Sequence, residues 1–427
     1  MNVIRERLAR HRAGQHAGFY SVCSAHPLVL EAALLEAKET GDVAMIEATS
    51  NQVNQDGGYT GLRPAAFRDL VLGIAASVGL EASRVLLGGD HLGPNCWQSE
   101  PAADAMAKAD RLVSDYVLAG FRKIHLDCSM ACAGEPAALG DGLIAARTAR
   151  LAAQAESAWQ ASGGEPPVYV IGSEVPVPGG AREALDHLAV TRPEAALATV
   201  EAHRRAFAAA GLTAAWERVV ALVVQPGVEF GHDSVVDYCP ERAAALSSAI
   251  EAMPGLVYEA HSTDYQTRRA LADLVRDHYA ILKVGPATTF ALREALWALE
   301  AIVADLHPAG AVHALRTTVL AALHADASHW RAYYESSGTA LDLQLQYSLS
   351  DRIRYYWTVP SVRDAVERLF ATCDASPPPL ALVSQYLPGA VAALREGRLA
   401  LRARDLAIHH VRGVLGDYSA ACRSLES

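Results

Sequence analysis

The chain has 427 residues, of which 51% are hydrophobic and 20% are charged, a composition that excludes a disordered protein and predicts a large buried core. Its formal net charge of −11 argues against a general role in binding nucleic acid. No stretch reaches the roughly 18 apolar residues of a membrane helix, and the arginine-rich start lacks the apolar run of a signal peptide. We therefore expect a cytoplasmic protein whose partner is a small molecule, not a nucleic acid or a membrane.

The first residues predict a charged amphipathic helix. After it, eight short segments rich in Val, Ile and Leu alternate with longer segments of helical spacing. The predicted strands are Gly18–Cys23, Val43–Glu47, Arg84–Asp90, Lys123–Asp127, Val168–Glu174, Val219–Gln225, Leu256–Glu259 and Ala280–Val284. This alternation is typical of parallel strands joined by helices, and eight units match a closed barrel better than a doubly wound sheet. We predict an α/β fold, a (β/α)₈ TIM barrel over residues 1–300.

Residues 301–427 lose this alternation and contain helical segments such as Ala311–Leu323 and Ser361–Cys373. We expect a C-terminal helical extension packed on the barrel. Within it, Arg352 and Arg354 are either a phosphate clamp that reaches back to the barrel or part of an interface. The extension and the N-terminal helix also offer surfaces for a homo-oligomer.

Polar side chains gather at the predicted C-terminal strand ends, where the chemistry of a (β/α)₈ barrel takes place. In chain order they are Glu47, Thr49, Ser50, Asn51, Asp90, His91, His125, Asp127, Glu174, Gln225, Glu259, His261 and Lys283. Charges this crowded are costly unless a metal or a ligand joins them. Structural salt bridges are the alternative, for Glu47 and Lys283 in particular.

Asp90 and His91 lie in the segment Leu86–Gln98, where flanking glycines allow a ligand to approach the backbone and Pro94 forces a loop. An acid beside a histidine at a strand end can place one group on a divalent metal and the other against a substrate hydroxyl. The pair is therefore a candidate for combined metal binding and acid/base chemistry.

Two histidines and a carboxylate with an open coordination position form a plausible divalent metal site. We expect His91, His261 and Glu174 to bind Zn²⁺ or Mn²⁺, and His232 or Gln225 could complete the set. Ordinary hydrogen-bonded histidines are the alternative.

The segment Leu282–Phe290 runs from the last strand into a helix that is expected to begin near Thr288. Backbone N–H groups of Gly285 and its neighbours at that helix start would form the usual phosphate site of this fold, which predicts a sugar phosphate. An ordinary Gly-Pro turn with a threonine cap is the alternative. Lys283 could instead form a Schiff base with a ketose carbonyl.

Several of these segments together resemble the family of tagatose-bisphosphate aldolase subunits called GatZ/KbaZ, which includes D-tagatose 6-phosphate 4-epimerases. The resembling segments are Ile46–Gln55, Gly88–Trp97, Ile124–Asp127, Glu174–Gly180, Val224–Phe230, Glu259–Gln266, Ser350–Trp357 and Ser384–Pro388. They extend from the second strand into the extension, so the resemblance covers nearly the whole chain.

This family is distantly similar to the metal-dependent class II aldolases. The resemblance implies that Asp90 is the catalytic acid/base, that His91 and His261 are metal ligands, and that Glu174 is a metal-associated glutamate. The departure lies at the sixth strand, where Gln225 stands in Val-Gln-Pro-Gly in place of the usual His-Gly.

The resemblance implies two competing roles. In the first, the protein interconverts D-tagatose 6-phosphate and D-fructose 6-phosphate by retro-aldol cleavage and re-addition, which inverts C4. In the second, it is a non-catalytic subunit that stabilises a class II tagatose-1,6-bisphosphate aldolase. A regulator that binds the sugar phosphate without turnover is a third class. We favour the enzyme, because a pure scaffold has little physical reason to keep so polar a barrel mouth.

The expected site follows from the enzyme interpretation. Asp90, Asp127 and Glu174 are the expected catalytic residues. The phosphorylated ketohexose is expected to contact Glu47, Asn51, Gln225, Ser262, Asp264, Lys283, Gly285, Thr288 and Arg354.

Overall fold

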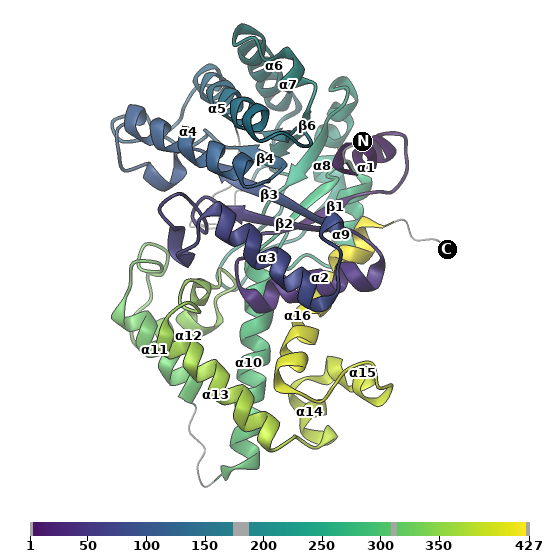
Figure 1. The fold of residues 1–427 in the computed structure, drawn as a ribbon, viewed down its shortest axis with the longest axis vertical. Helices are drawn as coiled ribbons and strands as arrows, with labels where there is room; N and C mark the ends of the chain where they lie inside the picture. The colour runs from purple at the N-terminus through teal and green to yellow at the C-terminus, as the bar shows by residue number, and fades with distance from the viewer. Residues whose placement is uncertain (1–2, 174–187, 309–313, 424–427) are drawn as a thin grey trace.

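The computed structural model describes residues 3–173, 188–308 and 314–423, and within these ranges eight parallel strands close into a barrel (Figure 1). The barrel strands are β1 (Phe19–Val22), β2 (Ala44–Thr49), β3 (Val85–Leu92), β4 (Lys123–Leu126), β5 (Val168–Ile171), β6 (Val219–Val224), β9 (Val257–Ala260) and β10 (Ile281–Val284). They pair in chain order, and β1 closes the barrel by pairing with β10, with Phe19 opposite Ile281. The predicted TIM barrel and its eight strands are confirmed.

Helices surround the strands as the alternation predicted. They are α2 (Pro27–Thr40), α3 (Pro64–Val78), α4 (Ala102–Leu118), α5 (Asp141–Ser162), α6 (Pro193–Ala209), α7 (Thr213–Trp216), α8 (Pro240–Ala249), α9 (Arg268–Arg276) and α10 (Pro286–Leu306). Many begin with proline, whose fixed φ suits the first helical turn. Gly41 and Gly79 end α2 and α3 in the left-handed conformation, which a residue without Cβ adopts readily. None of the described helices is long and apolar enough to cross a bilayer.

The N-terminal helix α1 (Val3–Arg12) covers the bottom of the barrel, at the N-terminal ends of the strands. Its Ile4 and Leu8 pack into an apolar cluster with side chains from the strands, such as Phe19 and Val220. Apolar side chains therefore fill the lower barrel interior.

The upper interior of the barrel is polar instead. Glu47, Lys123, His125 and Glu259 point into it and are fully buried. Buried charges require partners, so this layer must form a compensated network.

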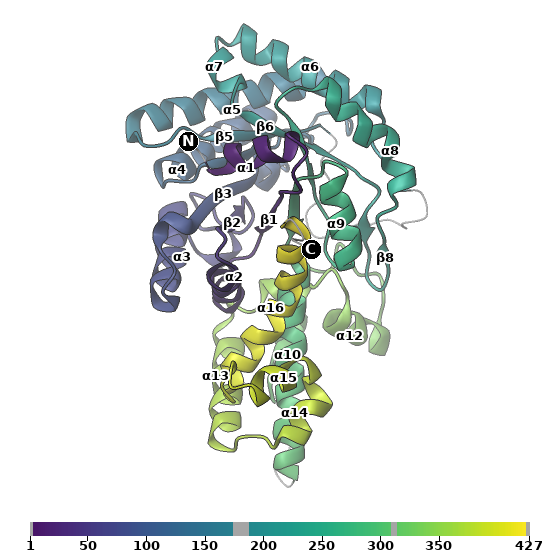
Figure 2. The same ribbon diagram turned by 90° about the vertical axis from the view of Figure 1, so that its right-hand side faces the viewer.

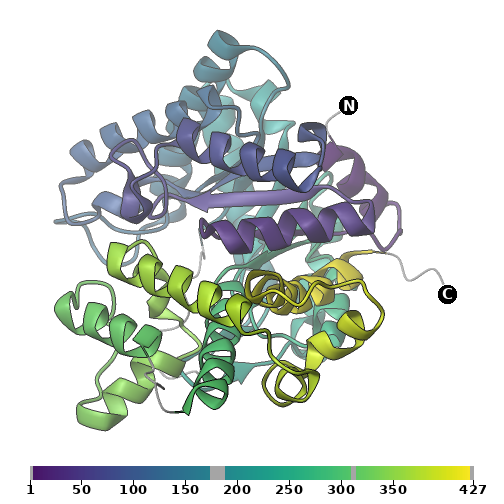
Figure 3. The ribbon, with the colours of Figure 1, turned by 60° about the horizontal axis from the view of Figure 1, so that its bottom comes forward.

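The C-terminal extension is built on two long helices that it shares with the barrel. It comprises α11 (Ala314–Ala325), α12 (Gly338–Tyr347), α13 (Pro360–Ala375), α14 (Leu380–Tyr386), α15 (Val391–Arg395) and α16 (Ala403–Cys422). Helix α10 leaves the barrel and enters the extension, and α16 runs back beside it (Figure 2). Figure 3 turns these green and yellow helices toward the viewer. The predicted boundary at residue 300 falls inside α10 and stays a prediction.

A short antiparallel hairpin follows the sixth barrel strand and was not predicted. It consists of β7 (Glu229–Phe230) and β8 (Val235–Val236). Strands of two residues leave no period that a sequence pattern could reveal. The hairpin places Phe230 in the wall of the cavity described below.

Candidate functional site

The Asp90-His91 pair lies at an irregularity near the C-terminal end of β3. The pairing of β3 with β4 shifts register between Gly89 and Leu92, and His91 has a φ of 48°, which is rare for a residue with a side chain. In a regular strand, neighbouring side chains point to opposite faces. Here both Asp90 and His91 line the same cavity at the barrel mouth, which is the kind of reorientation that a β-bulge produces.

Three imidazole rings meet beside this pair. The ring centroids of His91, His125 and His261 lie 5.0–5.2 Å from one another. They come from three different barrel strand ends, so the cluster depends on the closed fold. Their convergence brings together side chains as far apart in the chain as His91 and His261.

Each imidazole is held by a carboxylate. Nδ1 of His91 lies 2.7 Å from Asp127, Nε2 of His261 lies 2.9 Å from Glu259, and Nδ1 of His125 lies 2.8 Å from Asp90. A carboxylate on one ring nitrogen fixes the ring and leaves the other nitrogen for a metal. Among the described atoms, Nε2 of His125 is buried without a hydrogen-bond partner.

The electrostatic environment differs between the histidines. Burial lowers the pKa of His261 to about 4, so its imidazole is neutral at neutral pH. Burial also acts to lower the pKa of His91, but the negative charges of Asp90 and Asp127 outweigh it and raise that pKa. Neutral imidazole is the form that binds a metal, so the raised pKa of His91 acts against metal binding there.

Two buried lysines connect the carboxylates beneath the imidazoles. Nζ of Lys123 lies 2.7 Å from Glu47 and also pairs with Glu259, while Nζ of Lys283 pairs with Glu47 and lies 2.9 Å from Asp90. Burial acts to lower the pKa of both lysines, but the surrounding carboxylates raise it. Lys283 is thus held as an ammonium ion, which is not a nucleophile, and this argues against a Schiff base.

The donor set fits a divalent cation. Donor atoms of Asp90, His125, Glu259 and His261 lie within 4.8 Å of one another. The described network contains four carboxylates but two ammonium groups, so negative charge is in excess when the imidazoles are neutral. Imidazole and carboxylate ligands together suit Zn²⁺ or Mn²⁺.

A cavity of about 80 Å³ opens above the cluster. The predicted site residues that line it are Asn51, Asp90, His91, His261, Ser262, Asp264, Lys283, Gly285 and Arg354. Their roles as site residues stay predictions. Ser262 and His91 both have positive φ, and such strain is common where a fold fixes functional side chains.

Other predicted residues support the lining or lie apart from it. Glu47 pairs with both lysines below the cavity, and Asp127 lies behind His91. Gln225 accepts a hydrogen bond from the Gly227 N–H at 2.7 Å. Glu174 lies outside the described residues. His232 contacts Ser348 in the extension at 3.0 Å.

The N-terminus of α10, the expected phosphate site, already holds a carboxylate. Oδ1 of Asp264 accepts hydrogen bonds from the N–H groups of Gly285 (2.9 Å) and Ala287 (2.8 Å). The hydroxyl of Thr288 donates to the Gly285 carbonyl at 2.7 Å. Burial raises the pKa of Asp264 to about 6, although these two N–H groups act to lower it.

Sequence reasoning assigned no role to Lys123, Tyr59 or Tyr355, and it named His125 and Glu259 only as polar strand ends. The sequence did contain a pattern that could have revealed Lys123 and His125. Together with Asp127 they recur at every second position of the predicted strand, which places all three on its inward face. The two tyrosines come from loops, where no such period exists.

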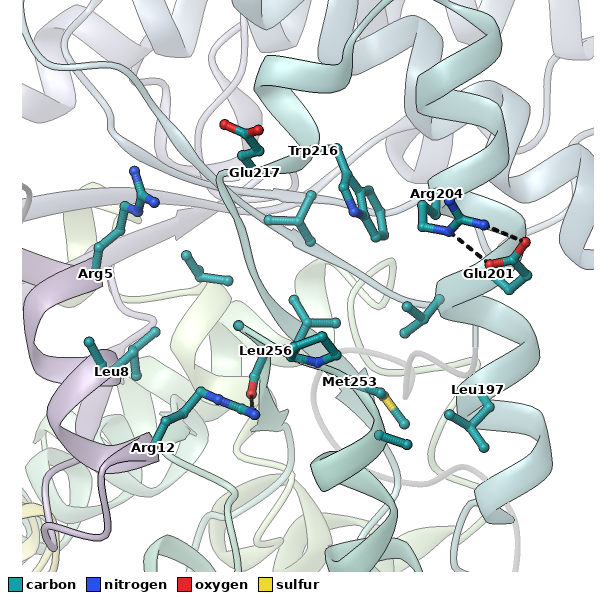
Figure 4. A pocket seen from close by; sticks show the side chains of 17 residues that line it. Arg5, Leu8, Arg12, Leu197, Glu201, Arg204, Trp216, Glu217, Met253 and Leu256 are labelled. Atoms are coloured by element: carbon teal, nitrogen blue, oxygen red, sulfur yellow. Dashed lines mark hydrogen bonds and ion pairs between the residues drawn. The ribbon is translucent and has the colours of Figure 1, made fainter.

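A larger cavity of about 880 Å³ lies at the opposite end of the barrel (Figure 4). It is lined by α1, α6 and the N-terminal ends of strands, and its charged groups are arginines and glutamates such as the pair Arg204–Glu201 (2.9 Å). Its lining contains no histidine or cysteine. The upper cavity, where the acids, bases and candidate metal ligands meet, is therefore the candidate site.

A (β/α)₈ barrel whose upper end carries imidazole and carboxylate donors defines a TIM-barrel protein with a candidate divalent-metal site. Residues 4–423 match the model of the family described as D-tagatose-1,6-bisphosphate aldolase subunit GatZ/KbaZ-like. The chain belongs to this family. Membership places it among proteins related to sugar-phosphate aldolases, as an enzyme or as an aldolase-related subunit.

The chain is also similar to solved structures. A crystal structure of a probable tagatose 6 phosphate kinase from Sinorhizobium meliloti 1021 is 49% identical, covers 95% of this chain and 100% of its own, and has a TM-score of 0.87. A fructose-bisphosphate aldolase from Campylobacter jejuni is 12% identical, with 86% and 93% covered and a TM-score of 0.44. The YdjI aldolase from Escherichia coli K12 is 10% identical, with 86% and 97% covered and a TM-score of 0.42.

Proposed function

We propose that the protein is a metal-dependent enzyme that interconverts D-tagatose 6-phosphate and D-fructose 6-phosphate by inverting C4. The observation that carries this proposal is the cluster of three imidazoles with ionised carboxylates beside an open cavity at the barrel mouth. A purely structural network could satisfy its charges without opening onto a cavity. Membership in an aldolase-related family supports the same chemistry.

The chemistry follows from the position of C4. Its hydrogen is β to the C2 carbonyl and is not acidified, so enolisation cannot invert this centre. Cleavage of the C3–C4 bond can: the C4 hydroxyl loses its proton and becomes an aldehyde, and the bonding electrons pass to C3 as an enediolate. The aldehyde turns its other face, the C3–C4 bond forms again, and the new C4 alkoxide regains the proton. The substrate and the product are isomers, so no co-reactant is required.

Asp90 is positioned to take and return this proton. Its Oδ1 accepts from the His91 N–H (3.0 Å) and contacts His125 (2.8 Å) and Lys283 (2.9 Å), while Oδ2 has only longer contacts, such as the Cys23 thiol at 3.7 Å. Burial acts to raise the pKa of Asp90, but His91 and Lys283 hold it well below its usual value. The carboxylate therefore stays ionised, with one oxygen left for a substrate hydroxyl.

His125 and His261 of the converging donor set would hold the divalent metal, and His91 and Glu174 are further predicted ligands outside that set. When bound, the metal supplies electrostatic stabilisation of the negative oxygens that develop at C2 and C3. Lys283 adds a fixed positive charge in the cavity wall. Arg354 in the cavity wall is a candidate group for the phosphate, which must hold the aldehyde fragment while it turns.

The experiment is to incubate the purified protein alone with D-tagatose 6-phosphate, with and without Zn²⁺ or Mn²⁺, and to follow D-fructose 6-phosphate by a coupled assay. We expect metal-dependent turnover that falls at least about a hundredfold in Asp90→Asn, since general acid–base groups contribute roughly 10²–10⁴-fold. Full activity in Asp90→Asn would contradict the proposed mechanism.

The second candidate function is the non-catalytic subunit, which the description of the matched family favours. It predicts no turnover with any metal, but higher activity when a class II tagatose-bisphosphate aldolase is added. That result would replace the epimerase proposal.

A further inference from the structure

The phosphate of the proposed substrate needs a positively charged site, and the usual one is not free. In a (β/α)₈ barrel a phosphate commonly binds at a helix N-terminus near the last strands. Here Asp264 accepts hydrogen bonds from two N–H groups at the start of α10. A phosphate at this position would have to displace a buried carboxylate that already satisfies those donors.

Two arginines from the extension lie nearby without ion-pair partners. Arg352 and Arg354 belong to a 3₁₀ turn, η7 (Arg352–Tyr355), that follows α12. Among the described residues, their hydrogen bonds go only to backbone carbonyls and to the Tyr355 hydroxyl. Neither guanidinium has a carboxylate within ion-pairing distance in that part of the chain.

Arg352 is the more unusual of the two. Its side chain is buried, with the residue 2% exposed, and stacks 3.2 Å from the ring centroid of Tyr333. Within the described structure its Nε and Nη2 have no hydrogen-bond partner. A buried cation without a charged partner is costly, and an anion bound beside Arg352 would supply the missing charge. Arg352 lines an open cleft, so such an anion has access to it.

The Tyr355 hydroxyl joins the two guanidinium groups. It accepts from Nη1 of Arg352 at 3.4 Å and from Nη2 of Arg354 at 3.1 Å. The phenolic oxygen thus lies between two cations. An oxygen of a phosphate dianion would bind these guanidinium groups more strongly than the neutral phenol does, because its hydrogen bonds are charge-assisted. The 3₁₀ turn is fixed in place by Asp351, which accepts a hydrogen bond from Thr289 of α10.

The two arginines also line two adjoining cavities, the candidate site and a neighbouring cleft, which we call the two hollows. Arg354 lines the candidate site, whereas Arg352 lines an adjoining cleft of about 810 Å³. Asn51, Tyr59 and Tyr355 line both. The candidate site alone, at about 80 Å³, is far smaller than the roughly 300–1,000 Å³ of typical ligand pockets, so a phosphorylated hexose must extend into neighbouring space.

We propose that the substrate's phosphate binds between Arg352 and Arg354 of the extension, at the boundary of these hollows, and not at the N-terminus of α10. This inference rests on the proposed sugar-phosphate function and assigns it a phosphate subsite. The sugar then reaches from this boundary toward Asp90 and Lys283. The extension becomes part of the binding site, because only it supplies both arginines.

The test is an equilibrium titration of the full-length protein with D-tagatose 6-phosphate, inorganic phosphate and unphosphorylated D-tagatose. In Arg352→Gln and Arg354→Gln we expect the dissociation constants of the two phosphate ligands to rise about tenfold or more, since one charge-assisted hydrogen bond contributes about 1.5–3 kcal/mol. The dissociation constant of D-tagatose should not change.

Arg293→Gln is the matched control. Arg293 is also buried, stacks 3.9 Å from the ring centroid of Phe290 and has unpartnered Nε and Nη2 among the described atoms, but it does not line either hollow. It should bind all three ligands as the unmodified protein does. If circular dichroism shows that Arg352→Gln does not fold, the half-buried Arg354 carries the test alone.

Unchanged phosphate binding in folded Arg354→Gln would overturn the subsite, and so would equal affinity of the unmodified protein for D-tagatose and D-tagatose 6-phosphate. If phosphate-dependent binding requires the arginines but the protein shows no turnover, the phosphate subsite stands and the epimerase proposal fails. If the protein shows turnover but binds phosphate independently of the arginines, the epimerase proposal stands and the subsite fails. The two proposals therefore fail separately.

Discussion

At the scale of single residues, His125 tests the metal proposal most directly. Its Nδ1 is engaged by Asp90, and its buried Nε2 lacks a partner among the described residues. We expect His125→Gln to weaken binding of Zn²⁺ and Mn²⁺ by more than about tenfold, because even groups that only support a metal ligand contribute about 10–100-fold. Metal titration of dialysed protein measures this.

The control for His125→Gln is His324→Gln, at an exposed position where the imidazole pairs with Asp342 at 2.8 Å on the surface. This variant should bind metal unchanged. Equal metal affinity of the two variants would mean that His125 is a structural histidine and that the ligand set must be sought elsewhere.

The convergence of polar side chains at the barrel mouth could be predicted from the sequence, but their contacts could not. The polar strand ends could be predicted, because residues of one strand face share a spacing of two and the ends of parallel strands converge. That Asp264 occupies the start of α10 could not, because the contact joins two loops whose approach depends on the closed barrel. The positive φ of His91 is likewise imposed by the surrounding structure, not by its own conformational preference.

At the scale of elements, the close approach of the β3 and β4 ends depends on Gly93. A Cβ on this residue would lie 1.7 Å from the Asp127 carbonyl oxygen, and the obstacle is backbone. We expect Gly93→Ala to lower the free energy of unfolding by at least about 1–3 kcal/mol, as overpacking does, and to reduce activity by displacing Asp90 and Asp127. Urea unfolding and the coupled assay measure the two effects.

Gly413→Ala provides the comparison for that substitution. Gly413 lies within α16, and nothing lies within 4 Å of a Cβ built there. Alanine should stabilise this helix by up to about 1 kcal/mol. If Gly93→Ala behaved in the same way, the ends of β3 and β4 would be free to separate, and the bulge would not be held by this contact.

Docking of α1 should depend on pH through His11. Burial, with a contribution from His278, lowers the pKa of His11 to about 4 from its usual 6.5. Between pH 4 and pH 6.5 the imidazole of His11 binds a proton more readily in the unfolded chain than in the folded one. The contribution of neutral His11 to the free energy of unfolding is therefore present above pH 6.5 and is lost as the pH falls toward 4. His11→Gln should therefore lose less stability on acidification than the unmodified protein. Parallel pH profiles of the urea midpoint would contradict this.

At the scale of the whole molecule, the barrel and the extension pack on each other through α10 and α16. Helix α16 returns to the barrel, where the Tyr418 hydroxyl donates to the Thr263 carbonyl at 2.6 Å and the Cys422 carbonyl accepts from the Gly18 N–H at 2.9 Å. The same helix packs on α2, α9 and α10. Helices α10 and α16 thus contact both parts, and the boundary predicted at residue 300 stays a prediction.

A chain ending at residue 300 should therefore not fold as a native barrel. It would expose the faces of α2, α9 and α10 that α16 covers, and it would lose both arginines of the proposed phosphate subsite. We expect no cooperative thermal transition by circular dichroism and no binding of D-tagatose 6-phosphate. A truncated chain that unfolded cooperatively would make the extension a separate domain. If it also bound D-tagatose 6-phosphate with the affinity of the full chain, the phosphate would have to lie within the barrel, against the arginine subsite.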